Sequence, residues 1–187
     1  MSKKKIDFRK YLNLRNVLIA LVILLVALIW SRYVTGILLV IVFAPITFIT
    51  VRYAKMVPHI SIESNTAMSC FIGYIFGPIV GLFYGLAVGG FSYVMNSFVS
   101  ITYVSTIILA GVAGFLTGTM HSAFGMPFAT AYFAAIIIRT VIAFPWFTMV
   151  GISPFESFTH QTSQMFFNLV IYLPLLSALY DLLAPVI

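Results

Sequence analysis

Charged residues are scarce in this sequence. Only 7% of its 187 positions are Asp, Glu, Lys or Arg, whereas 62% are hydrophobic. Soluble globular domains carry about 25% charged residues, because their surfaces must face water. This composition excludes an ordinary water-soluble domain and indicates a chain whose main solvent is a lipid bilayer.

The groups that most enzymes use for catalysis are few and scattered. The four acidic residues are Asp7, Glu63, Glu156 and Asp181, and no two are close enough in sequence to predict a carboxylate pair. The histidines, His59, His121 and His160, have no metal-ligand partner at helical spacing. P-loop, nucleotide-binding and nucleophile-elbow motifs are also lacking. We therefore predict no enzymatic activity, no metal site and no cofactor.

A single cysteine, Cys70, is present. It excludes an internal disulfide and a cysteine-rich metal site. Because it lies in an apolar stretch, we expect it to be a small packing residue.

Positive charge is concentrated at the N-terminus. Six of the ten basic residues lie in residues 1–15, namely Lys3, Lys4, Lys5, Arg9, Lys10 and Arg15. In a soluble domain the net charge of +6 would suggest nucleic acid. Here the positive-inside rule and attraction to anionic lipid explain it. We therefore expect no nucleic-acid partner, a cytoplasmic segment 1–15 and a location in the cell membrane.

Apolar runs separated by polar breaks predict one all-α transmembrane domain over residues 1–187. The expected helices lie near residues 16–31, 35–52, 65–92, 101–120, 128–150 and 161–184. The third run is interrupted by Gly77-Pro78, where proline removes a helical hydrogen bond and disfavours helical geometry at Gly77. It is either one kinked span or two shorter helices. With two, there are seven helices and every later loop changes side.

The same third run carries a regular stripe of glycines. Gly73, Gly77, Gly81, Gly85 and Gly89 recur every four residues, with Pro78 inside the series. Small residues at this spacing let helices approach backbone to backbone. We predict that this stripe packs against neighbouring helices in the centre of the bundle.

Arg139 lies near the middle of an apolar run. An arginine at the centre of a membrane helix costs about 3 kcal/mol unless it is paired or hydrated. Snorkelling or bracing through a carbonyl would be the structural explanation. We favour a role in holding an anionic or polar ligand.

The last helix has a polar face. Gln161, Gln164, Asn168 and Tyr172 are spaced three, four and four residues apart, so they share one side. Such a face suits either a ligand pocket or hydrogen bonding between helices. In the six-helix count it begins at the outer membrane face, which favours a pocket. The predicted solute-binding residues are Arg139, Trp146, Glu156, His160, Gln161, Gln164, Asn168 and Tyr103. An intramembrane enzyme would instead require Glu156, His160 and Arg139 to converge.

Residues 57–184 resemble the substrate-binding S components of energy-coupling factor transporters. A polar stretch leads to a G-x-x-x-G-P-x-x-G element, here Gly73, Gly77, Pro78 and Gly81, followed by STIILAGVAGFLTG and QMFFNLVIYLPLLSALYDLL. In that family the G-P element often lies in a turn between two helices. The family's A-x-x-x-A docking pattern is only partly matched, by Ala20-x-x-x-Leu24 and Ala27-x-x-x-Ser31.

This resemblance implies a small six-helix protein that captures a vitamin-like solute from outside. Its partners would be a transmembrane coupling subunit and two ATPase subunits, and release inside would follow toppling of the bundle. The alternative is a non-catalytic membrane scaffold that resembles the small cell-shape proteins of the rod complex, which have similar size and helix content.

Overall fold

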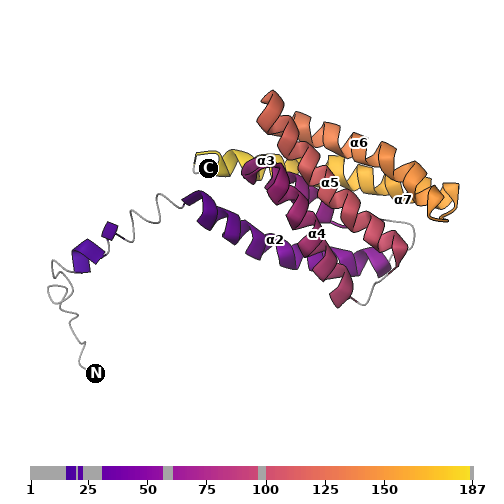
Figure 1. Ribbon diagram of the computed structural model, residues 1–187, viewed down its shortest axis with the longest axis horizontal. Helices are drawn as coiled ribbons and strands as arrows, with labels where there is room; N and C mark the ends of the chain where they lie inside the picture. Colours follow the sequence, from indigo (N-terminus) through magenta and orange to yellow (C-terminus); the bar gives the residue numbers. More distant parts are fainter. Residues whose placement is uncertain (1–15, 20, 23–30, 57–60, 97–99, 186–187) are drawn as a thin grey trace, which may run out of the picture.

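The computed structural model describes residues 16–19, 21–22, 31–56, 61–96 and 100–185 (Figure 1). Within these ranges the ordered elements are helical and no strand is found. The elements from residue 31 onward are α2 (Ser31–Met56), α3 (Asn65–Phe76), α4 (Pro78–Met95), α5 (Ile101–Phe124), α6 (Phe128–Met149), α7 (Pro154–Phe167), the π-helical turn η2 (Asn168–Tyr172) and α8 (Leu173–Leu183). The basic segment 1–15 and most of the first predicted helix, including its partial docking pattern, lie outside the described residues.

Five of the described helical stretches are long and apolar enough to cross a membrane. They are Val34–Ala54, Pro78–Met95, Ile101–Phe124, Phe128–Met149 and Pro154–Leu183. Large apolar side chains cover their outer faces, as at Ile37, Phe83 and Val141, each more than 60% exposed. Such a surface is stable only in lipid. The chain is a multi-pass, all-α membrane protein, as its composition predicts.

Gly77 separates the third predicted run into two helices. Its backbone φ of 105° lies in a region that glycine tolerates, and Pro78 begins α4 because its missing N–H is not needed there. With twelve residues, α3 is about 18 Å long, well short of the ~30 Å hydrocarbon core. The single-span interpretation of residues 65–92 is therefore wrong, and the two-helix alternative is correct.

The helices α3 and α4 form an antiparallel hairpin with the glycines on its inner side. A Cβ built on Gly81 would lie 2.5 Å from Cα of Gly73, and one on Gly85 would lie 2.8 Å from Oγ of Ser69. Gly89 lies in the same register, against the side chain of Asn65. Gly77 differs from the others, because a Cβ there would meet nothing within 4 Å. Its contribution is the conformation of the turn.

The helix α5 closes this hairpin through glycines of its own. Hypothetical Cβ atoms on Gly111, Gly114 and Gly118 would lie 3.0 Å or less from backbone atoms of α3 or α4. Close backbone approach of this kind maximises van der Waals contact between helices. The three helices therefore form a tightly packed centre, against which the remaining helices are placed.

The bundle has two chemically different ends. At one end, called here the aromatic end, Phe71, Tyr74, Phe128 and Tyr180 pack edge to face or stacked, with ring centroids 5.1 to 5.8 Å apart. The opposite end holds the end of α2, the start of α3 and the end of α4. There Thr50 Oγ1 lies 2.9 Å from Ser64 Oγ, and Asn96 Nδ2 donates to the carbonyl of Phe48. We call it the polar end.

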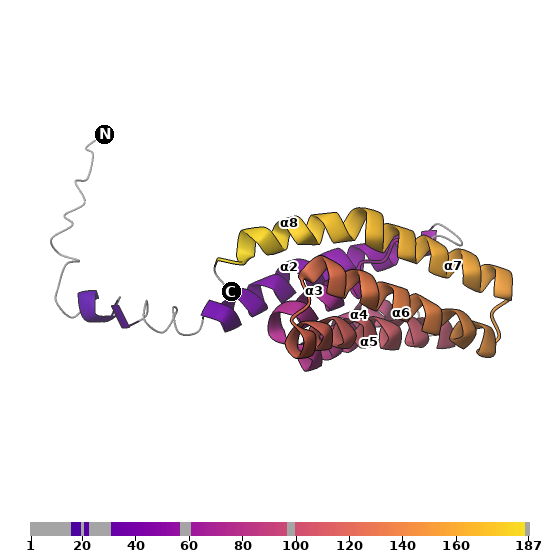
Figure 2. The same cartoon turned by 90° about the horizontal axis from the view of Figure 1, so that it is seen from above.

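The last three elements run along one side of the bundle as one long ribbon (Figure 2). Within it, η2 widens the helix at Asn168–Tyr172. Pro174, at the start of α8, cannot donate a hydrogen bond to the preceding turn, which gives a local reason for the wider turn. Single π-helical turns inside α-helices are frequent at functional sites.

Candidate functional site

Arg139 is the largest fully buried side chain described, with 1% of its surface exposed. It projects from the middle of α6 toward α7, where Nη1 donates a hydrogen bond to Oε1 of Gln161. Its two other donor nitrogens, Nε and Nη2, are buried and have no hydrogen-bond partner in the part of the chain that the structure describes. The guanidinium is therefore anchored on one side only.

Glu63 supplies the opposite charge from the segment that precedes α3. It is also 1% exposed. Its carboxylate accepts hydrogen bonds from Thr66 Oγ1 at 3.1 Å, from Tyr93 Oη at 3.2 Å and from Gln164 Nε2. These donors come from α3, α4 and α7, so the carboxylate ties three helices together.

Burial raises the pKa of the Glu63 carboxyl above its ordinary value. The positive charge of Arg139 and the three hydrogen bonds act in the opposite direction. The two charged groups nevertheless share no direct hydrogen bond, because the only bonded nitrogen of Arg139 faces Gln161.

The two glutamines of α7 lie between these charges. They are three residues apart and so occupy the same helix face. Gln161 turns its oxygen to Arg139, whereas Gln164 turns its nitrogen to Glu63 and, at 3.2 Å, to Thr66 Oγ1. Each amide thus keeps its other end without a partner, which leaves Gln161 Nε2 and Gln164 Oε1 unbonded. The six residues Glu63, Thr66, Tyr93, Arg139, Gln161 and Gln164 are called here the Arg–Glu cluster.

The unbonded atoms make this cluster a binding-site candidate. Three buried donors, Arg139 Nε, Arg139 Nη2 and Gln161 Nε2, and one buried acceptor, Gln164 Oε1, have no partner among the described residues. Leaving a polar group buried without a hydrogen bond costs about 1–3 kcal/mol, and more if it is charged. A polar molecule that satisfies these atoms would recover much of that free energy.

Asn168 belongs to the same helix face but has a different role. Its Oδ1 accepts from Tyr132 Oη at 2.9 Å, and its Nδ2 donates to the carbonyl of Gln164 at 2.7 Å. Tyr172, one turn further on, donates to the carbonyl of Ile62 at 2.8 Å. These side chains are bonded to the protein and brace the helix that carries the two glutamines.

The remaining predicted site residues are not brought into the cluster. Trp146 is 46% exposed, and its Nε1 donates to Ser105 Oγ at 2.9 Å. Glu156 is exposed in the first turn of α7. The rings of His160 and Phe147 pack at 6.0 Å, and Tyr103 packs at 5.2 Å on Tyr93, a cluster member. The predicted set therefore divides into Arg139, Gln161 and Gln164 inside the cluster and five residues around it.

The predicted set of site residues did not include Glu63, Thr66 or Tyr93. Glu63 was visible only as one of four scattered acidic residues. The available signal was its position in the polar stretch SIESNT, directly before an apolar helix, because a carboxylate there has few ways to reach water. Among the described residues, no group of three His, Cys, Asp or Glu side chains gathers as metal ligands would.

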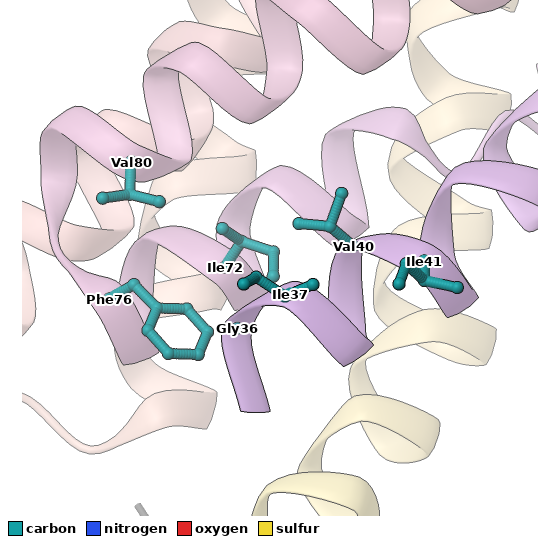
Figure 3. Close-up of a pocket in the computed structure, with 7 residues that line it drawn as sticks. All are labelled: Gly36, Ile37, Val40, Ile41, Ile72, Phe76 and Val80. Atoms are coloured by element: carbon teal, nitrogen blue, oxygen red, sulfur yellow. The ribbon is translucent and has the colours of Figure 1, made fainter. Parts of the chain in front are cut away.

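An apolar groove lies toward the start of α2 and the end of α3. Figure 3 shows a groove between α2, α3 and α4 that is lined by Gly36, Ile37, Val40, Ile41, Ile72, Phe76 and Val80. Its volume is about 510 Å³. Every lining side chain is apolar, so the groove offers nothing to orient a polar solute.

Neither a protein-family model, nor a curated protein, nor a solved structure matches this chain.

Proposed function

We propose that this protein is the membrane-embedded solute-binding subunit of an uptake transporter, with the Arg–Glu cluster as its solute site. The observation that carries the proposal is the set of buried donors on Arg139 and Gln161 that have no partner. A purely structural arginine would be expected to have its nitrogens bonded to carbonyls or carboxylates.

The position of the cluster supports this role. Glu63 lies just before the first residue of α3, Tyr93 lies near the end of α4, and Gln161 lies in the second turn of α7. The cluster therefore extends from the polar end to Arg139 in the middle of α6. The closely packed glycines of α3, α4 and α5 give the site a rigid support.

The energy source is proposed to be external to the chain. Because the sequence has no ATPase motif, uptake would depend on a transmembrane coupling subunit and ATPase subunits in the cell membrane. This agrees with the resemblance to S components. Affinity purification tests it directly: co-purifying coupling ATPases support transport, whereas wall-synthesis partners without them would support the scaffold alternative.

Uptake also requires the polar end to face outward. Separation of α3 from α4 adds one helix, so a seven-helix count from a cytoplasmic N-terminus would place the loop of residues 151–160 inside, not outside as the six-helix count does. Uptake therefore requires the orientation opposite to the one that this count gives. Orientation can be measured by thiol labelling, because the native Cys70 is fully buried. We expect Ser153→Cys, at the polar end, to react with an impermeant maleimide in intact cells. Ser122→Cys, at the opposite end, should react only after permeabilisation, and the reverse pattern would rule out uptake from outside.

Solute binding itself is tested on the purified full chain. We expect a small molecule to co-purify and to be detected by mass spectrometry after denaturation. The same molecule, added back after removal, should raise the unfolding temperature. If no small molecule is retained and none in a vitamin panel shifts that temperature, the proposed function is wrong.

A further inference from the structure

The chemical class of the solute can be inferred from which edge of Arg139 is free. A guanidinium has an end-on edge, Nη1 with Nη2, and a side-on edge, Nε with Nη2. Gln161 occupies Nη1, and both nitrogens of the side-on edge are buried without a partner. The two parallel N–H groups of this edge match the two oxygens of a carboxylate, which they bind in bidentate fashion.

Gln161 adds a third donor beside that edge. Because its amide oxygen accepts from Arg139, its amide nitrogen must be the unbonded end. The orientation of the amide is fixed by this hydrogen bond. Three unbonded donors and one positive charge are therefore carried by two side chains that are hydrogen-bonded to each other.

The charge of the cluster indicates which kind of anion its three unbonded donors would bind. The cluster holds one arginine and one carboxylate, Glu63, which already accepts three hydrogen bonds. A dianionic phosphate would face a single positive charge and a nearby negative one, at high cost in a medium of low dielectric constant. A neutral amide would leave part of the donor set unbonded. A single carboxylate satisfies the donors at the smallest excess of negative charge.

We propose that the solute is a small monocarboxylic compound whose carboxylate binds side-on to Arg139 and accepts a further hydrogen bond from Gln161. This assignment rests on the proposed solute-binding function and specifies its substrate class.

The test compares carboxylic acids with their own primary amides on the purified full-length protein. Suitable pairs are nicotinate with nicotinamide, biotin with biotinamide, and lipoate with lipoamide, and any compound released by denaturation is identified by mass spectrometry. We expect the released compound to carry a carboxylate. We also expect an acid that raises the unfolding temperature to bind at least tenfold more tightly than its amide.

Variants then show which side chains cause the preference for the acid over the amide. Arg139→Lys keeps the positive charge but loses the side-on pair of donors, so it should reduce the acid-over-amide preference at least tenfold. Gln161→Glu exchanges the third donor for a negative charge and should act in the same direction. Thr117→Val, a change at a buried hydroxyl on α5 that lies outside the cluster and donates to the carbonyl of Ala113, is the control and should keep the preference.

The outcomes separate this inference from the function on which it rests. A released compound without a carboxylate, or equal affinity for acid and amide, would overturn the substrate class while solute binding stands. No released compound and no stabilisation by either member of any pair would overturn both. The acid–amide comparison uses the unaltered protein, so it decides the matter even if the Arg139 variant does not fold.

Discussion

Gln161 Oε1 accepts a hydrogen bond from Arg139 Nη1 across the interface between α6 and α7. This contact joins the one arginine at membrane depth predicted from the sequence to the polar face of the last helix. It also fixes which atoms of both side chains remain unbonded. Nη1 of Arg139 therefore braces the interface, whereas Nε and Nη2 on the side-on edge remain unbonded.

Glu63→Gln should lower the stability of the protein. The substitution removes the negative charge that compensates Arg139 and replaces one carboxylate oxygen, an acceptor, with an amide donor. Removing the compensating charge of a buried ionic group costs about 3–5 kcal/mol in directly paired cases, and less is expected here because Glu63 and Arg139 do not bond directly. The measurement is the unfolding temperature in detergent. Glu156→Gln, at an exposed position, is the control and should leave it unchanged.

Asn168→Ala should lower the stability of the protein rather than act specifically on its affinity for a solute. Both ends of the Asn168 amide are bonded within the protein, to Tyr132 and to the carbonyl of Gln164. Loss of these bonds leaves the buried Tyr132 hydroxyl without its closest partner, at a cost of about 1–3 kcal/mol. Thermal unfolding and solute affinity should be measured together. A large loss of affinity with unchanged unfolding temperature would contradict this bracing role.

Gly81→Ala should disrupt the packing of α3, α4 and α5. The added methyl group would lie 2.5 Å from Cα of Gly73 and 2.8 Å from the carbonyl oxygen of Gly114, so backbones would have to move apart. Gly90→Ala is the matched control on the same helix, because a Cβ there meets nothing within 4 Å. At Gly90 alanine should stabilise the helix by up to about 1 kcal/mol. Equal unfolding temperatures for the two variants would show that the close approach is unimportant.

Gly77→Ala tests the turn between α3 and α4 through conformation alone. Its φ of 105° is unfavourable for any residue with a Cβ, although space around it is free. We expect a loss of about 1–3 kcal/mol, the usual cost of a residue held in a sparsely populated backbone region. Chemical denaturation would measure it. A variant as stable as the parent would mean that the hairpin turn tolerates another backbone conformation.

Local sequence patterns were sufficient to predict part of the structure of this protein. Composition and apolar runs determined that it is a helical membrane protein, because a bilayer requires long apolar helices whatever their arrangement. The spacing of Gln161, Gln164 and Asn168 placed them on one face, since helical periodicity depends only on neighbouring residues. The pair Gly77-Pro78 marked a break, but its geometry admitted either a kink or a turn.

Only the tertiary structure decided which side chains from distant parts of the sequence contact one another. Glu63 and Gln164 are 101 residues apart, and Tyr93 reaches the same carboxylate from another helix. No local pattern encodes such contacts, because they depend on how α3, α4 and α7 pack around the close approach of their backbones. The same packing decided that Gly77 turns the chain, that Asn168 is a brace, and that the side-on edge of Arg139 is free. The sequence by itself thus determined that the chain forms helices in a lipid bilayer. The packing of those helices determined which residues form the Arg–Glu cluster.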